Sequence, residues 1–195
     1  MLWFIGLGIS GADGLGVDAI KVLKNADVVF LEVFTSPIAR SQLVKMKKLV
    51  KGKLRTVSRW VVEDGKAILS EAKNRKVVLV SYGDPFIATT HIELRVRAIS
   101  EKIKTRTMHA ASAIPSLIGE CGLHYYKICR PVTMMQDKQS ATSVYQTLYE
   151  NLIDGNHTVI ILEYNSDSNF FLDPDRKSTR LNSSHIQKSR MPSSA

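Results

Sequence analysis

The stretch that decides the fold is Phe4–Gly11, FIGLGISG, in which apolar residues run directly into three closely spaced glycines. The spacing Gly-x-Gly-x-x-Gly after an apolar strand is that of the dinucleotide-binding fingerprint. Glu32 ends a second apolar run about 20 residues later, where an acidic ribose ligand is expected in such folds. One hypothesis is therefore an NAD(P)-binding oxidoreductase that uses Gly6, Gly8, Gly11 and Glu32.

The residues that follow this stretch argue against a dinucleotide site. In a dinucleotide fold the helix begins within the glycine loop, so that its free N–H groups meet the pyrophosphate. Here the chain continues as Gly11–Gly16, GADGLG, and each glycine inside a helix costs about 1 kcal/mol relative to alanine. The helix is therefore predicted to begin near Val17. A glycine-rich bend after a first parallel strand still predicts a ligand crevice at that edge of the sheet.

Apolar strands alternate with amphipathic helices through most of the chain. Strands are predicted at 2–5, 28–33, 54–57, 76–81 and 105–109, and helices at 17–24, 38–50, 61–72, 94–103 and 112–119. Thr90 and Glu93 have the spacing of a capping box before the fourth helix. This alternation is typical of an α/β fold with a mostly parallel sheet covered on both faces. A stretch at 131–134, a helix at 140–153 and a strand at 158–164 predict a second α/β unit that stops before its sheet is complete.

We expect an N-terminal domain at 1–111, a truncated C-terminal domain at 112–174 and a disordered tail at 175–195. The tail has no apolar period and is rich in serine and basic residues. Its first eleven residues read as the translation of a common sequencing-library adapter, and residues 189–195 read as the far end of the same adapter. We therefore predict that the tail is not native and that the natural reading frame continues beyond Pro174.

The charge of the chain gives little support to nucleic-acid binding. The net charge is +9, but the tail supplies five Lys or Arg residues against one Asp, which leaves +5 without it. The basic run at 45–48 is interpreted as a solvated helix face. A basic, non-enzymatic binding protein that uses this run stays open as a third hypothesis.

Membrane and redox signals are absent from the sequence. No apolar run approaches the roughly 20 residues that a bilayer requires, and no secretory signal precedes the first strand. Cys121 and Cys129 are too far apart for a Cys-x-x-Cys pair, which indicates a reducing compartment and no metal site. The sequence predicts a cytoplasmic protein that contacts neither nucleic acid nor membrane.

A second bend, Ser81–His91, follows the most strand-like run of the first half. It supplies backbone amides, the Asp84 carboxylate, threonine hydroxyls and the His91 imidazole at the edge that holds the first loop. In a plainer interpretation, Gly-Asp-Pro is only a turn and Thr90 is only a helix cap.

Four segments in fixed order carry a family resemblance: IGLG at 5–8, GDPFIATTH at 83–91, HAASAIPSLIGECGLHYYK at 109–127 and HTVIILE at 157–163. Across residues 1–165 the chain resembles the diphthine synthase family of tetrapyrrole-methylase-like S-adenosylmethionine methyltransferases. The resemblance implies two α/β/α domains, with S-adenosyl-L-methionine in the cleft between them, and a homodimer. It also implies that the acceptor is translation elongation factor 2, methylated on the amine of its 3-carboxy-3-aminopropyl-modified histidine in diphthamide biosynthesis.

The resemblance further implies the contacts to the methyl donor. Carried over position by position, they fall on Ile9, Asp84, Ile87, Ser112, Ala113 and Leu162. Asp84 is the best polar candidate because a carboxylate accepts hydrogen bonds from a ribose or an amino group. The chain departs from the family pattern at Ala113, where isoleucine is frequent, and at 128–129, where Phe-Gly is usual. The family's last donor-binding positions lie beyond Pro174, so the donor site of this chain is expected to be incomplete.

No side chain is assigned as catalytic. Methyl transfer from a sulfonium is an in-line displacement in which alignment supplies most of the rate, so a dedicated base is optional. His91, His109, His124 and His157 have the chemistry of a base, and each is interpreted as a structural hydrogen-bonding residue. The sequence does not fix how many methyl groups are transferred.

Overall fold

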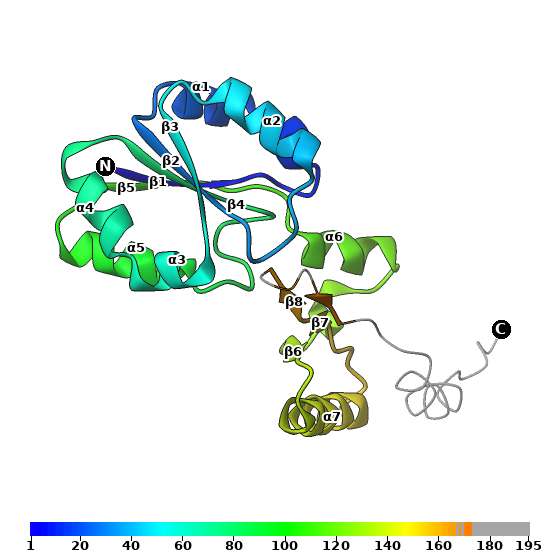
Figure 1. Ribbon diagram of the computed structural model, residues 1–195. Helices are drawn as coiled ribbons and strands as arrows, with labels where there is room; N and C mark the ends of the chain where they lie inside the picture. Colours follow the sequence, from blue (N-terminus) through cyan, green and yellow to red (C-terminus); the bar gives the residue numbers. More distant parts are fainter. Residues whose placement is uncertain (167, 169, 173–195) are drawn as a thin grey trace.

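Five short strands form one parallel sheet at the centre of the larger unit (Figure 1). The computed structural model describes residues 1–166, 168 and 170–172, so the predicted tail at 175–195 lies outside the described residues. The strands are β1 (Leu2–Gly6), β2 (Val28–Glu32), β3 (Lys53–Val57), β4 (Val77–Ser81) and β5 (Thr105–Met108), in the order β3-β2-β4-β1-β5. Every strand pair in this sheet is parallel, as the alternation of strands and helices predicts.

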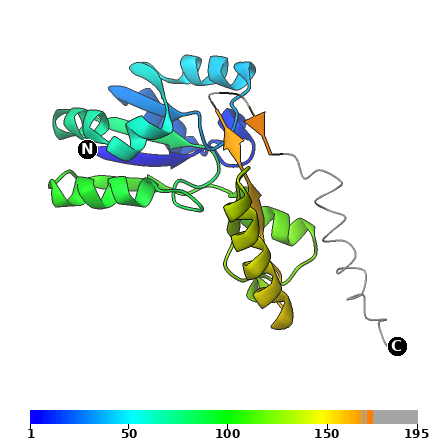
Figure 2. The same cartoon turned by 60° about the horizontal axis from the view of Figure 1, so that its bottom comes forward.

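Helices cover both faces of the sheet (Figures 1 and 2). One face carries α1 (Val17–Lys24) and α2 (Arg40–Leu49), and the other carries α3 (Arg59–Asp64), α4 (Lys66–Asn74) and α5 (His91–Ser100). Alternate strand residues serve the two faces, since Phe4 packs in the cluster with α3, α4 and α5 whereas Ile5 packs in the cluster with α1 and α2. Burial on both faces explains why β2 and β4 are almost continuous apolar runs.

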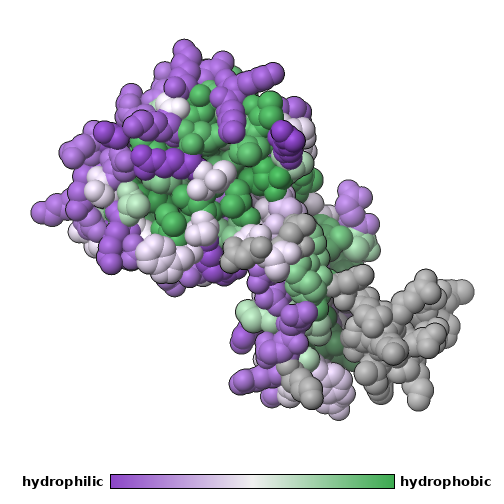
Figure 3. Space-filling model, viewed as in Figure 1, coloured by the Kyte–Doolittle hydropathy of each residue, from purple (hydrophilic) through white to green (hydrophobic). Residues whose placement is uncertain are grey.

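A smaller unit follows β5. It contains α6 (Ala113–Glu120), the 3-10 turn η2 (Tyr125–Lys127), β6 (Val132–Met134), α7 (Lys138–Ile153) and β7 (Ile160–Leu162). β6 and β7 pair in parallel, and the strand predicted at 158–164 is divided, because β8 (Tyr164–Asn165) turns to pair with β9 (Phe170–Phe171). Apolar surface is present on both units (Figure 3). The α/β class and the second α/β unit are confirmed, and the domain boundary at 111/112 stays a prediction.

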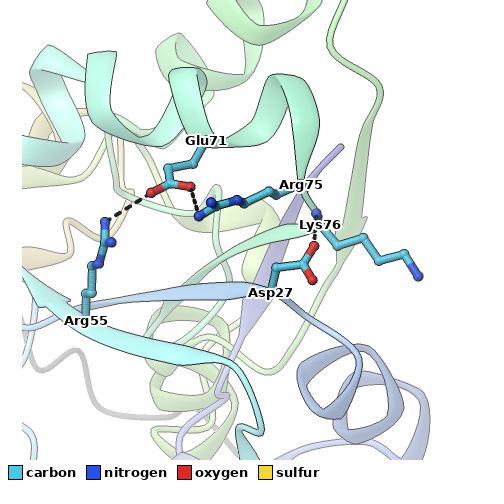
Figure 4. Close-up of polar contacts among 5 residues, drawn as sticks. All are labelled: Asp27, Arg55, Glu71, Arg75 and Lys76. Atoms are coloured by element: carbon cyan, nitrogen blue, oxygen red, sulfur yellow. Dashed lines mark hydrogen bonds and ion pairs between the residues drawn. The ribbon is translucent and has the colours of Figure 1, made fainter.

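Polar contacts fasten the sheet to α4 on the side of the strand starts (Figure 4). The Glu71 carboxylate accepts hydrogen bonds from Arg75 at 2.7 Å and from Arg55 of β3 at 3.4 Å. The Lys76 N–H donates to the Asp27 carboxylate at 2.7 Å, which joins the starts of β2 and β4. Because the two arginines are half-exposed, each ion pair contributes only about 1 kcal/mol or less.

None of the helices in the described part of the chain combines the length and apolarity of a membrane span.

The helix predicted at 61–72 is in fact two helices, separated at Gly65. Gly65 has a φ of +66°, in the left-handed region that favours glycine, and its N–H donates to the Val61 carbonyl at 3.0 Å. The residue also packs closely against α5, because a Cβ added there would lie 2.6 Å from Leu94 Cδ1. The prediction was wrong because the apolar spacing continues across Gly65 although the backbone turns there.

The capping box predicted before α5 does not form. The helix begins at His91, ahead of the predicted start at Leu94, and the Thr90 hydroxyl makes no capping hydrogen bond. Thr90 has φ −88° and ψ 0°, outside the extended region typical of an N-cap, and only its carbonyl bonds to the Glu93 N–H, at 3.0 Å. The pattern therefore predicted the helix and its N-cap position, Thr90, but not the missing capping hydrogen bond or the helical turn ahead of Leu94.

Candidate functional site

The loops that follow β1 and β4 are joined backbone to backbone. The Gly8 N–H donates to the Gly83 carbonyl at 3.2 Å, and the Gly83 N–H donates to the Gly8 carbonyl at 3.1 Å. The Leu7 N–H donates to the Ser81 carbonyl at 2.8 Å. Gly8 and Gly83 have φ of +67° and +63°, which L residues with a side chain rarely adopt. The two glycine-containing motifs of the sequence thus form one structure at the carboxyl edge of the sheet.

The segment after β5 packs against these two loops. A Cβ on Gly6 would lie 2.3 Å from the Gly83 carbonyl oxygen and 2.8 Å from the Ala110 Cβ, so only glycine fits there. A Cβ on Gly83 would meet, among described atoms beyond its chain neighbours, only the Ser112 Cα at 3.8 Å, so the space above Gly83 is open. Parallel α/β sheets bind ligands at this edge. We call the three joined segments the rim: residues 7–11, 82–88 and 109–113.

Asp84 ties the rim together through a buried carboxylate. Its Oδ1 accepts from the Phe86 N–H at 2.9 Å, and its Oδ2 accepts from the Ala110 N–H at 3.2 Å and from His109 Nδ1 at 2.8 Å. A carboxylate has about four lone-pair sites, so capacity for one further hydrogen bond remains. The residue predicted as a polar donor contact therefore also connects the bend after β4 to the segment after β5.

His109 lies at the exposed end of this connection. Its side chain is 68% exposed, whereas that of Asp84 is 5% exposed. Because a carboxylate only accepts hydrogen bonds, Nδ1 carries the hydrogen, and Nε2 of the neutral ring is an acceptor. The Phe86 ring meets the imidazole edge-on with centroids 6.2 Å apart, and the Arg95 guanidinium of α5 lies over the Phe86 ring at 5.3 Å. The rim thus carries an oriented and accessible imidazole.

Two isoleucines predicted as donor contacts are exposed on the rim. Ile9 is 56% exposed and Ile87 is 43% exposed. Next to Ile87, Ala88 has a φ of +55°, a conformation that costs a non-glycine residue about 1–3 kcal/mol and that clusters at functional sites. Exposed apolar side chains on a fixed backbone are typical of the wall of a ligand site rather than of a core.

Three further predicted contacts lie at or beyond the start of α6. Ser112 is the N-cap of α6, and its Oγ accepts from the Ile114 N–H at 3.4 Å. Ala113 is the first, exposed residue of the helix. Leu162 lies in β7 and pairs with Met134 of β6, in the sheet of the smaller unit. The structure therefore brings all the predicted contacts except Leu162 to the rim.

The first loop is anchored to α2. The Ala12 N–H donates to Gln42 Oε1 at 2.8 Å, and Gln42 Nε2 donates to the Asp13 carboxylate at 3.1 Å. Lys45, from the basic run at 45–48, forms an ion pair with the same carboxylate. These contacts hold the short 3-10 helix η1 (Gly11–Gly14) in place, and they engage one lysine of the basic run within the protein itself.

Glu32, the ribose ligand of the oxidoreductase hypothesis, is enclosed. Its side chain is 1% exposed and accepts from the Thr35 hydroxyl at 2.7 Å. Burial raises the pKa of Glu32 to about 7, although hydrogen bonds from Thr35 and from the Tyr82 N–H oppose the shift. In addition, α1 begins at Val17, after η1 rather than within the glycine loop. Neither the acidic residue nor the helix start matches a dinucleotide site, so the oxidoreductase hypothesis is not supported.

His91 packs against Glu32 behind the rim. Its Nδ1 bonds to the Pro85 carbonyl at 3.1 Å. Its Nε2 lies 3.8 Å from Glu32 Oε2 and has no hydrogen-bond partner among the described residues. Burial lowers the pKa of His91. Sequence reasoning missed this pair and the Asp84–His109 pair, because their members come from different elements and no local spacing connects them.

Comparison with known proteins identifies relatives of the chain. Residues 1–182 match the family described as Tetrapyrrole (Corrin/Porphyrin) Methylases. The chain is 32% identical over 177 residues to the diphthine synthase of Methanosarcina barkeri and 33% identical over 178 residues to that of Methanococcoides burtonii, with 87% of the chain aligned in each case. It covers 66% and 67% of those two proteins, so it spans about two thirds of the length of these curated relatives.

Solved structures share the fold. A crystal structure of a diphthine synthase has a TM-score of 0.72 at 27% identity and covers 82% of this chain and 62% of that one. A conserved protein of Aeropyrum pernix K1 has a TM-score of 0.82 at 24% identity over 98% of this chain and 68% of that one, which shows the fold alone. The matched residues, the curated relatives and the shared fold together show that the chain belongs to the tetrapyrrole (corrin/porphyrin) methylase family, with diphthine synthases as its relatives there.

Proposed function

We propose that the chain is an S-adenosyl-L-methionine-dependent methyltransferase of diphthamide biosynthesis, acting on translation elongation factor 2. The acceptor is the amine of the 3-carboxy-3-aminopropyl-modified histidine. The single observation that carries this proposal is the rim, in which Asp84 and the Gly8–Gly83 hydrogen bonds lock together three segments that resemble diphthine synthase motifs. The curated relatives support the choice of substrate, since they are diphthine synthases.

The residues of the rim fit a sulfonium donor that carries an adenosyl group. The open space above Gly83 lets a ligand approach the backbone. Exposed Ile9 and Ile87 supply apolar surface, and Asp84 retains acceptor capacity and a negative charge that favours a cationic ligand. The proposed contacts are Ile9, Asp84, Ile87, Ser112 and Ala113 on the rim, with Leu162 contributed by the smaller unit.

In the proposed methyl transfer, the chain mainly aligns the donor with the acceptor amine and forms no covalent bond itself. When bound, the donor supplies an electrophilic methyl group on a positively charged sulfur. Backbone hydrogen bonds fix the rim segments to one another before any ligand binds, and the anchored η1 fixes the first loop. Such preorganisation contributes up to about 7–11 kcal/mol to a reaction between two bound groups, because the entropy of bringing them together is lost on binding.

Calorimetry with S-adenosylhomocysteine and with NAD tests the donor site, on a full-length version of the protein that also supplies the donor-binding positions expected beyond Pro174. We expect S-adenosylhomocysteine to bind and NAD not to bind. Asp84→Ala should weaken the binding by about tenfold or more, as expected when a hydrogen bond to a charged group is lost. Asp18→Ala is the matched control, because Asp18 pairs with Lys21 on the exposed surface of α1 and should leave binding unchanged. Binding of NAD that Glu32→Ala abolishes would overturn the proposal.

Transfer of a labelled methyl group tests the acceptor. Elongation factor 2 that carries the 3-carboxy-3-aminopropyl histidine should become labelled, and factor with an unmodified histidine should not. Equal labelling of both forms would show a different acceptor. We further propose that the full-length protein is a cytoplasmic homodimer. Light scattering of the full-length protein should give twice the mass of the monomer, and a monomer mass would refute the proposal.

A further inference from the structure

One imidazole on the rim has a fixed orientation and a free nitrogen. His109 Nδ1 is held by Asp84 Oδ2 at 2.8 Å. That carboxylate is itself fixed by the N–H groups of Phe86 and Ala110, at 2.9 and 3.2 Å. Among the described residues no hydrogen bond engages Nε2, and the side chain is 68% exposed. A buried carboxylate therefore orients a ring whose second nitrogen is an available proton acceptor.

This arrangement is that of a general base with its orienting group. In such pairs the acid residue selects the tautomer that leaves Nε2 free, and it stabilises the imidazolium that forms. A purely structural histidine is usually buried, as His91 is at 1% exposure. His124 and His157 belong to the smaller unit, outside the rim. Of the histidines in the described residues, His109 alone combines exposure, orientation and a place on the rim.

The proposed reaction needs a proton acceptor. An alkyl ammonium nitrogen has no lone pair, so the acceptor amine must lose one proton before it can attack a methyl carbon. Amines of this kind are largely protonated at neutral pH, since reference amino groups have pKa values of about 8 to 10. A base beside the donor site therefore raises the fraction of reactive amine where the reaction occurs.

We propose that His109, oriented by Asp84, is the general base of the methyl transfer, an inference that rests on the proposed function. Nε2 takes the proton from the ammonium nitrogen. The freed lone pair then forms the N–C bond to the methyl carbon, and the electron pair of the breaking C–S bond stays on sulfur as a neutral thioether. The imidazolium is stabilised by the Asp84 carboxylate and returns its proton to water.

Two charged groups set the surroundings of the ring. Asp84, from the bend after β4, bonds it directly, and Arg95, from α5, lies over the Phe86 ring that meets the imidazole edge-on. A protonated ring cannot accept a proton, and a protonated amine cannot attack, so acidification should slow the reaction.

His109→Asn tests the proposal in the full-length version of the protein, with S-adenosyl-L-methionine and modified elongation factor 2. The asparagine amide can still donate to Asp84 but cannot act as an imidazole base. We expect kcat to fall by about 10²–10⁴-fold and the acidic limb of the pH–rate profile to move to higher pH, where the amine loses its proton without help from a base. Affinity for S-adenosylhomocysteine should change by less than about threefold. His157→Asn, an exposed histidine of the smaller unit, is the matched control and should keep the parent's rate. In His109→Ala, added imidazole should restore part of the rate.

The outcomes separate the possible failures. An Asn variant that keeps the parent's rate and pH profile would overturn the assignment of the base. A loss of donor affinity as large as the loss of rate would assign His109 to holding the rim only, and would overturn it as well. A full-length parent protein that binds no S-adenosylhomocysteine would instead overturn the proposed function itself. If circular dichroism shows that His109→Asn is unfolded, His109→Gln gives the same test with a longer amide.

Discussion

The Glu32 side chain is buried, at 1% exposure, at the carboxyl end of β2 and directly behind the rim. The Thr35 hydroxyl and the backbone N–H groups of Thr35 and Tyr82 bond to it, and Arg59 of α3 adds a favourable charge. His91 faces it at 3.8 Å. Because burial penalises the carboxylate more than these groups stabilise it, the protonated form persists up to a pKa of about 7.

Glu32→Gln should therefore gain stability relative to the parent as pH rises. Between the ordinary pKa of 4.5 and the folded-state pKa of about 7, the unfolded chain releases a proton that the folded chain keeps. The parent loses stability with rising pH through this window, by about 3 kcal/mol in all, and glutamine does not titrate. Urea unfolding of both proteins at about pH 4.5 and pH 7.5 measures the change.

His91 acts in the opposite direction and is common to both proteins. Because its pKa is lowered in the folded protein, stability decreases as pH falls below about 6.5, where the unfolded chain binds a proton that the folded chain does not bind. The difference in free energy of unfolding between variant and parent, taken at each pH, therefore reports the contribution of Glu32 to the pH dependence. A stability difference that stays constant between the two pH values would show that Glu32 is ionised in the folded protein.

At the residue scale, the sequence predicted which positions within short motifs lie together, whereas their contact with a methyl donor stays a prediction. Ile9, Asp84, Ile87 and the start of α6 follow strand ends, and the carboxyl ends of parallel strands meet at one edge, so their convergence on the rim was predictable. The engagement of Asp84 by His109 was not, because the two residues are 25 positions apart and only the fold brings them together. The same holds for Glu32 and His91.

At the scale of elements, the glycine of β1 decides how closely three segments can pack. Gly6→Ala should destabilise the protein by about 3 kcal/mol, because the new Cβ would overlap the Gly83 carbonyl and Ala110, which backbone shifts must relieve. Gly119→Ala, within α6 and with no atom within 4 Å of its added Cβ, is the matched control and should stabilise by about 0.5–1 kcal/mol. Denaturant unfolding measures both; equal effects would mean that the rim is not tightly packed at Gly6.

The break between α3 and α4 makes a second prediction at this scale. Gly65→Ala should cost about 1–2 kcal/mol for a left-handed alanine, and a further amount for the overlap with Leu94 and Arg97. Gly155→Ala has a similar φ, +69°, and open space around the added Cβ, so it should show the backbone cost alone. Thermal unfolding compares the two variants. A Gly65 variant no less stable than the Gly155 variant would show that α5 can move away from the added Cβ without loss of stability.

The elements themselves were largely predictable, since buried strands and one-sided helices leave period and apolarity in the sequence. The strands of the large sheet and α1 were predicted to within a residue or two. The break at Gly65 was not, because apolar spacing reports which side of a helix is buried and not where the backbone turns. For α5 the predicted N-cap at Thr90 is correct, whereas the apolar spacing placed the helix later, from Leu94. The division at residue 163 depends on the pairing of β8 with β9, which no local pattern shows.

At the scale of the whole molecule, the two units have unequal cores. The larger unit has a buried apolar cluster on each face of its sheet. In the smaller unit, the described residues with buried apolar side chains are Ile118, Val132 and Val144. On α7, Tyr145 and Tyr149 stack with centroids 6.4 Å apart while remaining more than half exposed. Since buried apolar area supplies most of the stability, the larger unit should be the more stable one.

Amide hydrogen exchange should therefore divide the molecule into two parts. β1 and β4 each bond to a strand on both sides within the large sheet, so their amides should exchange only through unfolding of that unit. β6 and β7 pair only with each other among the described strands, and their amides should exchange at least about 100-fold faster. Since Leu162 lies in β7, S-adenosylhomocysteine should slow exchange in that strand if it bridges the units. Equal protection of β4 and β7 without ligand would mean instead that the two sheets unfold together and that the small sheet takes its stability from the large one.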